Sequence, residues 1–268
     1  MLLYRLAPEG FHAATAADGT ARILYSDPFA TDPADWELGR PVDPEAARLL
    51  APVVPGKVVG IGRNYREHAA ELGNPMPEEP LIFLKAPSSV IGPGAPVVLP
   101  PESERVEFEG EIAAVVRRRL RRAGEAEARG AILGVTCAVD VTARDLQRRD
   151  ATFARGKSFD TFCPLGPAVL VEPGLEALEL VTRLDGEERQ RGRAAEMAWG
   201  IAALAAYVSR FITLEPGDVI LTGTPSGVGP LADGQRLEVE IPGLGVLRTP
   251  VEAWRAEPGT GTGREVAE

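Results

Sequence analysis

Short apolar stretches separated by turns rich in glycine and proline run along most of the chain, and they predict more strands than helices. A strand is expected where apolar and β-branched residues follow one another for about four to eight positions. Such segments lie at 2–6, 21–25, 57–61, 81–84, 105–116, 132–139, 169–172, 180–184, 219–221, 236–241 and 246–251. The Asp185-Gly186 pair that ends one of them predicts a hairpin turn.

Helical spacing of apolar residues is confined to fewer segments. It predicts helices at 43–50, 66–72, 125–130, 142–149 and 198–211. The first of these begins with Asp43 at the N-cap and Pro44 at the first helical position. Strands and helices do not alternate regularly, which favours a β-dominated α+β fold over a doubly wound parallel sheet.

A change in composition divides the chain near residue 54. Residues 1–53 are rich in Ala, Asp and Pro and are interpreted as a small N-terminal domain. Residues 54–256 carry the strand-rich pattern of a second, catalytic domain, and the Gly-rich segment 257–268 is interpreted as a loose C-terminal tail.

Charge and composition exclude several classes of protein. The 29 basic and 39 acidic residues give a net charge of −10, whereas a nucleic-acid-binding protein usually carries a basic surface. The basic run 117–122 is interpreted as a solvated turn, with phosphate binding as the alternative. No apolar stretch is long enough for a membrane span or a signal peptide, so we expect a cytoplasmic protein that binds no membrane. Two cysteines and two histidines are too few for a zinc site with several such ligands.

Three acidic residues could form a metal site. Glu109 and Glu111 are two apart on a predicted strand, so their side chains point to the same side, where they repel each other unless a cation lies between them. Asp140 ends an apolar run, where an unpaired carboxylate is costly to bury. The alternatives are a solvated sheet face for the glutamates and an N-cap for Asp140. Together the three carboxylates suit Mg²⁺ or Mn²⁺.

Other residues could supply acid–base chemistry. His68 and Glu71 lie three apart on a predicted helix, and a carboxylate beside an imidazole orients it as a general base. A surface ion pair is the alternative. Lys157 is one of only three lysines in an Arg-rich chain. The Gly-rich segment 222–229 after a predicted strand either binds an anion or forms a simple turn.

Taken together, five ordered motifs over about residues 54–253 resemble the fumarylacetoacetate hydrolase family. They are Asn-Tyr-x-x-His at 64–68, Glu-x-Glu at 109–111, Asp-Val-Thr-Ala-Arg-Asp at 140–145, Lys-Ser-Phe-Asp at 157–160 and Thr-Gly-Thr-Pro-x-Gly-Val at 222–228. The resemblance implies three groups of site residues: catalytic His68, Glu71 and Lys157; substrate-binding Asn64, Tyr65, Arg144, Thr222 and Thr224; and metal-binding Glu109, Glu111 and Asp140.

The same resemblance implies a mixed β-sandwich roll that forms a homodimer, binds Mg²⁺ or Mn²⁺ and acts on small 2-oxo acids or their enols. Among the activities of the family, isomerisation of 2-hydroxyhepta-2,4-diene-1,7-dioate in aromatic catabolism is the leading expectation. An acylpyruvate hydrolase and an oxaloacetate-type decarboxylase are the alternatives. A non-catalytic binding protein on the same fold is an alternative of another class.

Overall fold

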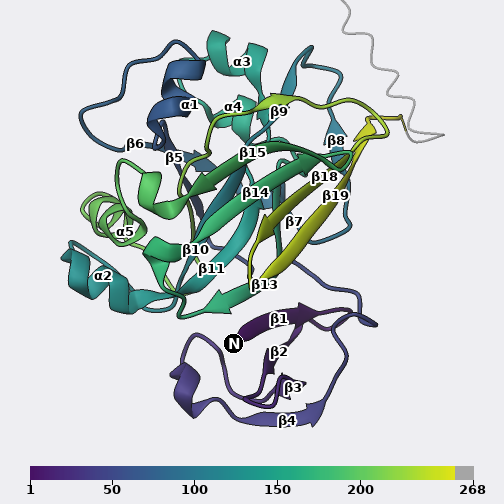
Figure 1. Ribbon diagram of the computed structural model, residues 1–268, viewed down its shortest axis with the longest axis vertical. Coiled ribbons are helices and arrows are strands. Elements are labelled where there is room, and N and C mark those ends of the chain that lie inside the picture. The colour runs from purple at the N-terminus through teal and green to yellow at the C-terminus, as the bar shows by residue number, and fades with distance from the viewer. Residues whose placement is uncertain (257–268) are drawn as a thin grey trace, which may run out of the picture.

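The computed structural model describes residues 1–256, which fold around one large mixed β-sheet (Figure 1). Eleven strands belong to this sheet, in the order β4-β3-β2-β1-β13-β11-β10-β16-β5-β6, with β7 paired to β13. A five-stranded sheet and a three-stranded sheet complete the β structure. The predicted β-dominated α+β class is therefore confirmed. The predicted tail, 257–268, lies outside the described residues.

The N-terminal segment extends the large sheet at one end of the molecule, at the bottom of Figure 1. Its antiparallel strands are β1 (Leu2–Leu6), β2 (Phe11–Thr15), β3 (Ala21–Leu24) and β4 (Leu38–Pro41). Strand β1 joins them to the rest, because Leu3 pairs with Val169 of β13. The division near residue 54 stays a prediction.

The inner strands of the large sheet are buried on both faces. They are β5 (Val58–Gly62), β10 (Gly110–Val116), β11 (Ile132–Val139), β13 (Cys163–Val171) and β16 (Val219–Leu221). Strands β6 (Leu81–Lys85) and β7 (Val90–Ile91) complete the sheet and are only partly buried. Successive residues of β10 enter opposite cores: Ile112 packs in one cluster, whereas Ala113 packs in the other. This two-sided burial explains why the sequence shows continuous apolar runs here.

The five-stranded sheet covers one face of the large sheet. It contains β8 (Val97–Leu99), β14 (Glu179–Leu184), β15 (Glu187–Arg193), β18 (Arg236–Ile241) and β19 (Gly245–Ala253). Leu180, Leu237 and Leu247 are fully buried in the same core as Ile112. The predicted hairpin turn joins β14 to β15, with Asp185 and Gly186 at φ values of 54° and 85°.

The predicted long strand 105–116 is wrong in one respect, because it breaks at Glu109. Its first part, β9 (Val106–Phe108), pairs with β12 (Thr142–Ala143) and β17 (Gly229–Pro230) in the three-stranded sheet, whereas β10 belongs to the large sheet. Gly110 follows the break, and a Cβ there would lie 2.0 Å from Thr182 Oγ1. Only glycine therefore fits at the point where the chain leaves the three-stranded sheet and enters the large sheet.

Helices are short and lie around the sheets. They are α1 (Arg66–Glu71), α2 (Glu125–Ala131), α3 (Arg144–Arg149), α4 (Ala154–Lys157) and α5 (Ile201–Ser209). Short 3₁₀ turns are η1 (Pro33–Asp35), η2 (Pro87–Ser89), η3 (Leu175–Ala177) and η4 (Ala194–Glu196). Among residues 1–256, no helix is both long and apolar enough to cross a membrane.

Two helix predictions need correction. Segment 43–50 forms turns rather than a helix, because the Asp43 carboxylate accepts a hydrogen bond from the Glu45 N–H in a local turn that does not continue. The predicted helix 142–149 begins only at Arg144, since Thr142 and Ala143 pair with β9. Asp140 does not cap this helix, which has Ala143 at its N-cap.

Candidate active site

Several chain segments meet at the end of the molecule opposite the N-terminal strands, where Figure 1 shows α1, α3 and α4 close together. This region also contains the end of β5, the junction between β9 and β10, the end of β11 and the loop after β16. They surround a cavity of about 310 Å³. Of the predicted site residues, His68, Glu109, Glu111, Asp140, Arg144, Lys157 and Thr224 line it.

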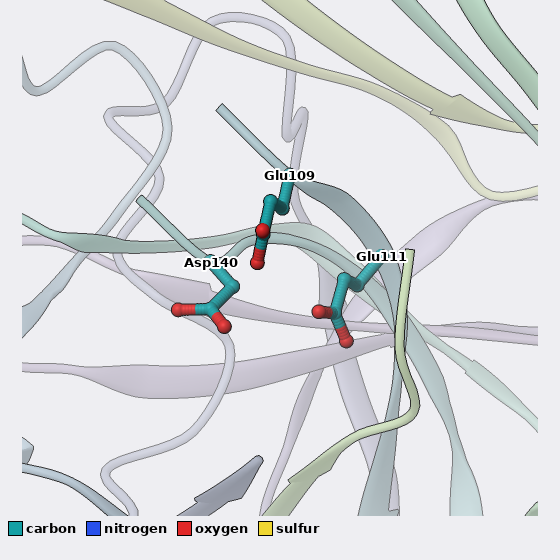
Figure 2. A group of neighbouring side chains, drawn as sticks. All are labelled: Glu109, Glu111 and Asp140. Atoms are coloured by element: carbon teal, nitrogen blue, oxygen red, sulfur yellow. The ribbon is translucent and has the colours of Figure 1, made fainter. Parts of the chain in front are cut away.

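Glu109, Glu111 and Asp140 lie close together in this region, as the sequence predicted (Figure 2). One carboxylate oxygen from each lies within 4.8 Å of the others, and the residues are only 5%, 2% and 1% exposed. Three buried carboxylates at this spacing need positive charge. An all-oxygen donor set fits a hard divalent cation such as Mg²⁺ or Mn²⁺.

Buried cations already face these carboxylates. The Lys157 ammonium donates to Glu109 Oε2 at 2.7 Å and to Asp140 Oδ2 at 2.5 Å. The Arg144 guanidinium donates to Glu109 Oε1 at 2.6 Å and to Glu107 Oε2 at 2.8 Å. Arg144 therefore orients a candidate metal ligand as well as lining the cavity.

Lys85 is a further member of the cluster that the sequence analysis missed. Its fully buried ammonium donates to Asp140 Oδ1 at 2.7 Å and to the Val141 carbonyl at 3.2 Å. Asp140 thus holds a lysine on each carboxylate oxygen. A signal was present in the sequence, since Lys85 is one of three lysines and directly follows an apolar strand.

The surroundings of Glu109 and Glu111 shift the pKa values of these two residues in opposite directions. Burial by itself would raise the pKa of Glu109, but Lys157, Arg144 and His68 outweigh it and hold this pKa well below its usual range. The pKa of Glu111 is raised, first by burial and then by repulsion from Asp140 and Glu109. Glu111 is therefore the carboxylate that gains most from a bound cation.

His68 lies between the acidic cluster and Glu71. Its Nδ1 is 3.3 Å from Glu71 Oε2, and its Nε2 is 4.0 Å from Glu109 Oε1. The ring is buried and lines the cavity, whereas Glu71 is exposed beside it and also accepts a hydrogen bond from the Gly227 N–H at 3.0 Å. One ring nitrogen is oriented by a carboxylate, and the other faces the site, which is the arrangement of a general base.

The loop after β16 holds the carboxylates from the other side. The Gly223 N–H donates to Glu111 Oε2 at 2.6 Å, and Gly223 has a φ of 98°. The Thr224 hydroxyl donates to the Gly110 carbonyl at 2.7 Å and accepts from Gln190 Nε2 at 2.7 Å. Gln190 Oε1 in turn accepts from the Gly110 N–H at 3.0 Å, a contact between distant segments that the sequence analysis missed.

Three predicted substrate-binding residues lie behind the cavity wall. The Asn64 amide donates to the Thr222 and Trp199 carbonyls at 2.7 and 3.1 Å, and its oxygen accepts from the Trp199 N–H. The Thr222 hydroxyl donates to the Ile112 carbonyl at 2.7 Å. The Tyr65 hydroxyl is buried without a partner among the described residues, and burial raises its pKa. In this structure Asn64 and Thr222 fix the backbone around the site.

Comparison with known proteins identifies one matching family and several relatives. The family described as "Fumarylacetoacetate (FAA) hydrolase C-terminal" matches residues 57–252. The mitochondrial oxaloacetate tautomerase of Homo sapiens is 43% identical over a 212-residue alignment, which covers 74% of this chain and 68% of the relative.

Two solved structures cover nearly the whole chain. The 5-carboxymethyl-2-hydroxymuconate delta-isomerase of Mycobacterium smegmatis is 39% identical, with a TM-score of 0.86 over 95% of this chain and 100% of its own. The 2-hydroxyhepta-2,4-diene-1,7-dioate isomerase of Mycobacterium marinum is 38% identical, with a TM-score of 0.85 over 96% of this chain and 100% of its own.

Proposed function

Because the chain belongs to the fumarylacetoacetate hydrolase family of enzymes, we propose that it is a metal-dependent isomerase of 2-oxo acids and their enols. The observation that carries this proposal is the position of His68, whose ring lies between Glu71 and the buried carboxylates. Moving a proton within a substrate needs one oriented base beside a centre that stabilises negative charge. Two solved relatives that carry isomerase names support the same class of reaction.

The first candidate substrate is 2-hydroxyhepta-2,4-diene-1,7-dioate. In its isomerisation the hydroxyl group at C2 loses a proton and becomes a ketone, the double bonds shift, and C5 gains a proton. No atom is lost or gained overall. Oxaloacetate, whose keto and enol forms differ by one proton position, is a second candidate supported by the name of the human relative.

Each group of site residues has its own role in the proposed isomerisation. Glu109, Glu111 and Asp140 would hold Mg²⁺ or Mn²⁺, which when bound supplies a Lewis acid that stabilises an enolate oxygen. His68 takes the proton from one substrate atom and returns it to another, and Glu71 keeps the ring oriented. The Lys157 ammonium, held beside Glu109, offers positive charge to the oxygen that becomes negative. Thr224 and Arg144 line the same cavity and orient the substrate.

A spectrophotometric screen tests the proposal. The protein with Mg²⁺ is mixed with 2-hydroxyhepta-2,4-diene-1,7-dioate, oxaloacetate, acetylpyruvate and fumarylpyruvate, each with and without EDTA. We expect an EDTA-sensitive change in enol absorbance with an unchanged product mass for the first two. A product of lower mass would instead identify a decarboxylase, and two acids formed from an acylpyruvate would identify a hydrolase.

A matched pair of variants controls the screen. Glu109→Ala removes a candidate ligand and should abolish both Mg²⁺ binding and turnover. Glu104→Ala removes a nearby exposed carboxylate and should leave both unchanged. Normal turnover by the Glu109→Ala protein would contradict the metal assignment. Binding of Mg²⁺ without turnover of any substrate would favour the alternative of a non-catalytic binding protein.

The remaining expectations from the sequence belong to the same proposal. We propose a cytoplasmic homodimer that takes a small 2-oxo or dienoic acid as its partner and binds neither nucleic acid nor membrane. Light scattering of the purified protein tests the dimer, because a monomeric mass would overturn it.

A further inference from the structure

The cavity is lined by two chemically different groups of charged residues. One group is Glu109, Glu111 and Asp140 with their buried cations. The other is a pair of further arginines, Arg63 and Arg148. We propose that Arg148, assisted by Arg63, binds the second carboxylate of a dicarboxylic substrate, which makes the enzyme selective for 2-oxo diacids over monoacids. This inference rests on the proposed function and deepens it.

Helix α3 places Arg148 at a defined distance from the site. Arg144, Gln147 and Arg148 all line the cavity, and positions i, i+3 and i+4 share one face of a helix. Arg144 contacts Glu109, so Arg148 stands one turn farther along the axis, about 6 Å away at 1.5 Å per residue. In this proposal a substrate held by its 2-oxo carboxylate end beside Glu109 reaches Arg148 with its other carboxylate.

Neither arginine is neutralised by the protein. Within residues 1–256, no carboxylate forms an ion pair with Arg63 or Arg148, although Arg144 on the same helix face pairs with Glu107 and Glu109. The Gln147 amide oxygen accepts from Arg144 at 2.7 Å, which leaves its NH₂ group available as a donor. A cavity wall that carries unpaired guanidinium groups suits a carboxylate ligand, since arginine binds carboxylates through two parallel hydrogen bonds.

Arg63 reaches the cavity from another element, the end of β5. Its φ of 56° lies in the left-handed region, which costs an arginine about 1 kcal/mol or more relative to ordinary backbone. Unfavourable backbone conformations of this kind concentrate at ligand sites. The lining also includes the apolar side chains of Leu72, Leu81, Phe83 and Phe153, which suit the carbon chain between two carboxylates.

Equilibrium binding separates this proposal from catalysis. Calorimetry of the Mg²⁺-loaded protein compares 2-oxoglutarate with 2-oxovalerate, which have the same chain length but differ in the distal carboxylate. We expect the wild-type protein to prefer 2-oxoglutarate. Arg148→Gln should weaken 2-oxoglutarate binding by about tenfold, as the loss of one charge-assisted contact implies. The same variant should leave 2-oxovalerate binding unchanged, and Arg63→Gln should act in the same direction.

Arg149→Gln is the matched control, because Arg149 follows Arg148 on the same helix, is exposed and does not line the cavity. It removes the same charge and should change neither affinity. Equal affinity of the wild-type protein for the two acids would overturn the proposal, as would equal losses in the Arg148 and Arg149 variants. If enol absorbance changes in the screen but no diacid preference exists, the proposed function stands and only this inference fails. If neither acid binds to protein that binds Mg²⁺, both fail.

Discussion

Replacing Lys85 by methionine removes one buried positive charge from the carboxylate cluster while keeping a side chain of similar length. Asp140 Oδ1 then loses its partner at 2.7 Å, and Lys157 alone remains, on Oδ2. Removing one member of a buried ion pair costs about 3–5 kcal/mol, because the other charge is left buried and uncompensated. We expect a loss near the lower end, about 3 kcal/mol, since Lys157 still neutralises part of the charge.

Urea unfolding followed by circular dichroism, with EDTA present, measures this loss in the free energy of unfolding. A double-mutant cycle with Asp140→Asn isolates the pair, because the asparagine removes the charge that Lys85→Met leaves unpaired. The double variant should be more stable than the sum of the single losses predicts, by about 2 kcal/mol. Saturating Mg²⁺ should reduce the loss in Lys85→Met if the ion binds the same carboxylates, because the ion replaces the missing positive charge.

Lys57→Met is the matched control. Lys57 also pairs with a buried acid, Asp218, but its side chain is 27% exposed and Asp218 keeps a hydrogen bond from the Glu215 N–H. We expect a smaller loss in stability and no change in Mg²⁺ affinity, since Lys57 precedes β5 and the cavity lies at the other end of that strand. A Lys85→Met loss below about 1 kcal/mol, or an additive cycle, would refute the assignment of Lys85 as the buried counter-charge of Asp140.

Three other outcomes follow from the site. His68→Gln should lower kcat by about 10²–10⁴ and Glu71→Gln by less, with Mg²⁺ affinity kept in both; a parallel loss of calorimetric Mg²⁺ binding would contradict their role as base and orienting group. Because the pKa of Glu111 is raised, its contribution to the stability of the metal-free protein is present below its ordinary pKa and is lost as the pH rises through the raised pKa. Mg²⁺ binding should therefore release a proton, which calorimetry in buffers of different ionisation enthalpy detects, and it should weaken in acid. Binding that is independent of pH and releases no proton would contradict this. Burial raises the pKa of Cys137 and Cys163 to about 12, so neither thiol should react with a thiol reagent until the protein unfolds, and rapid labelling of native protein would disprove their burial.

Most strands could be predicted from the sequence because burial on two faces leaves uninterrupted apolar runs. Segments 132–139, 219–221 and 236–241 have the predicted bounds in the structure. Strand β13 was predicted only at its end, since Pro164, Gly166 and Pro167 in its first half normally argue against a strand. The break at Glu109 was not predictable, because it depends on which sheet each neighbouring segment joins.

The clustering of the three carboxylates could be predicted because two of them are close in sequence and the third follows a buried strand. The partners of these carboxylates could not. Lys85 and Gln190 lie 55 and 80 positions from the groups they contact, and no local pattern connects such distant residues. Asn64 shows the converse: its motif predicted a contact with substrate, whereas its amide is satisfied by backbone groups of distant segments.

The switch of the chain from one sheet to another at Glu109 makes the carboxylate cluster a junction. Glu109 follows the three-stranded sheet, Glu111 lies in the large sheet, and Gly110 between them is bound to Gln190 of the five-stranded sheet. A cation bound there would connect all three sheets at a single point. Chelation would then weaken the connection of the three sheets at this end of the molecule, and amide hydrogens in β9, β10 and β15 would lose protection from exchange together.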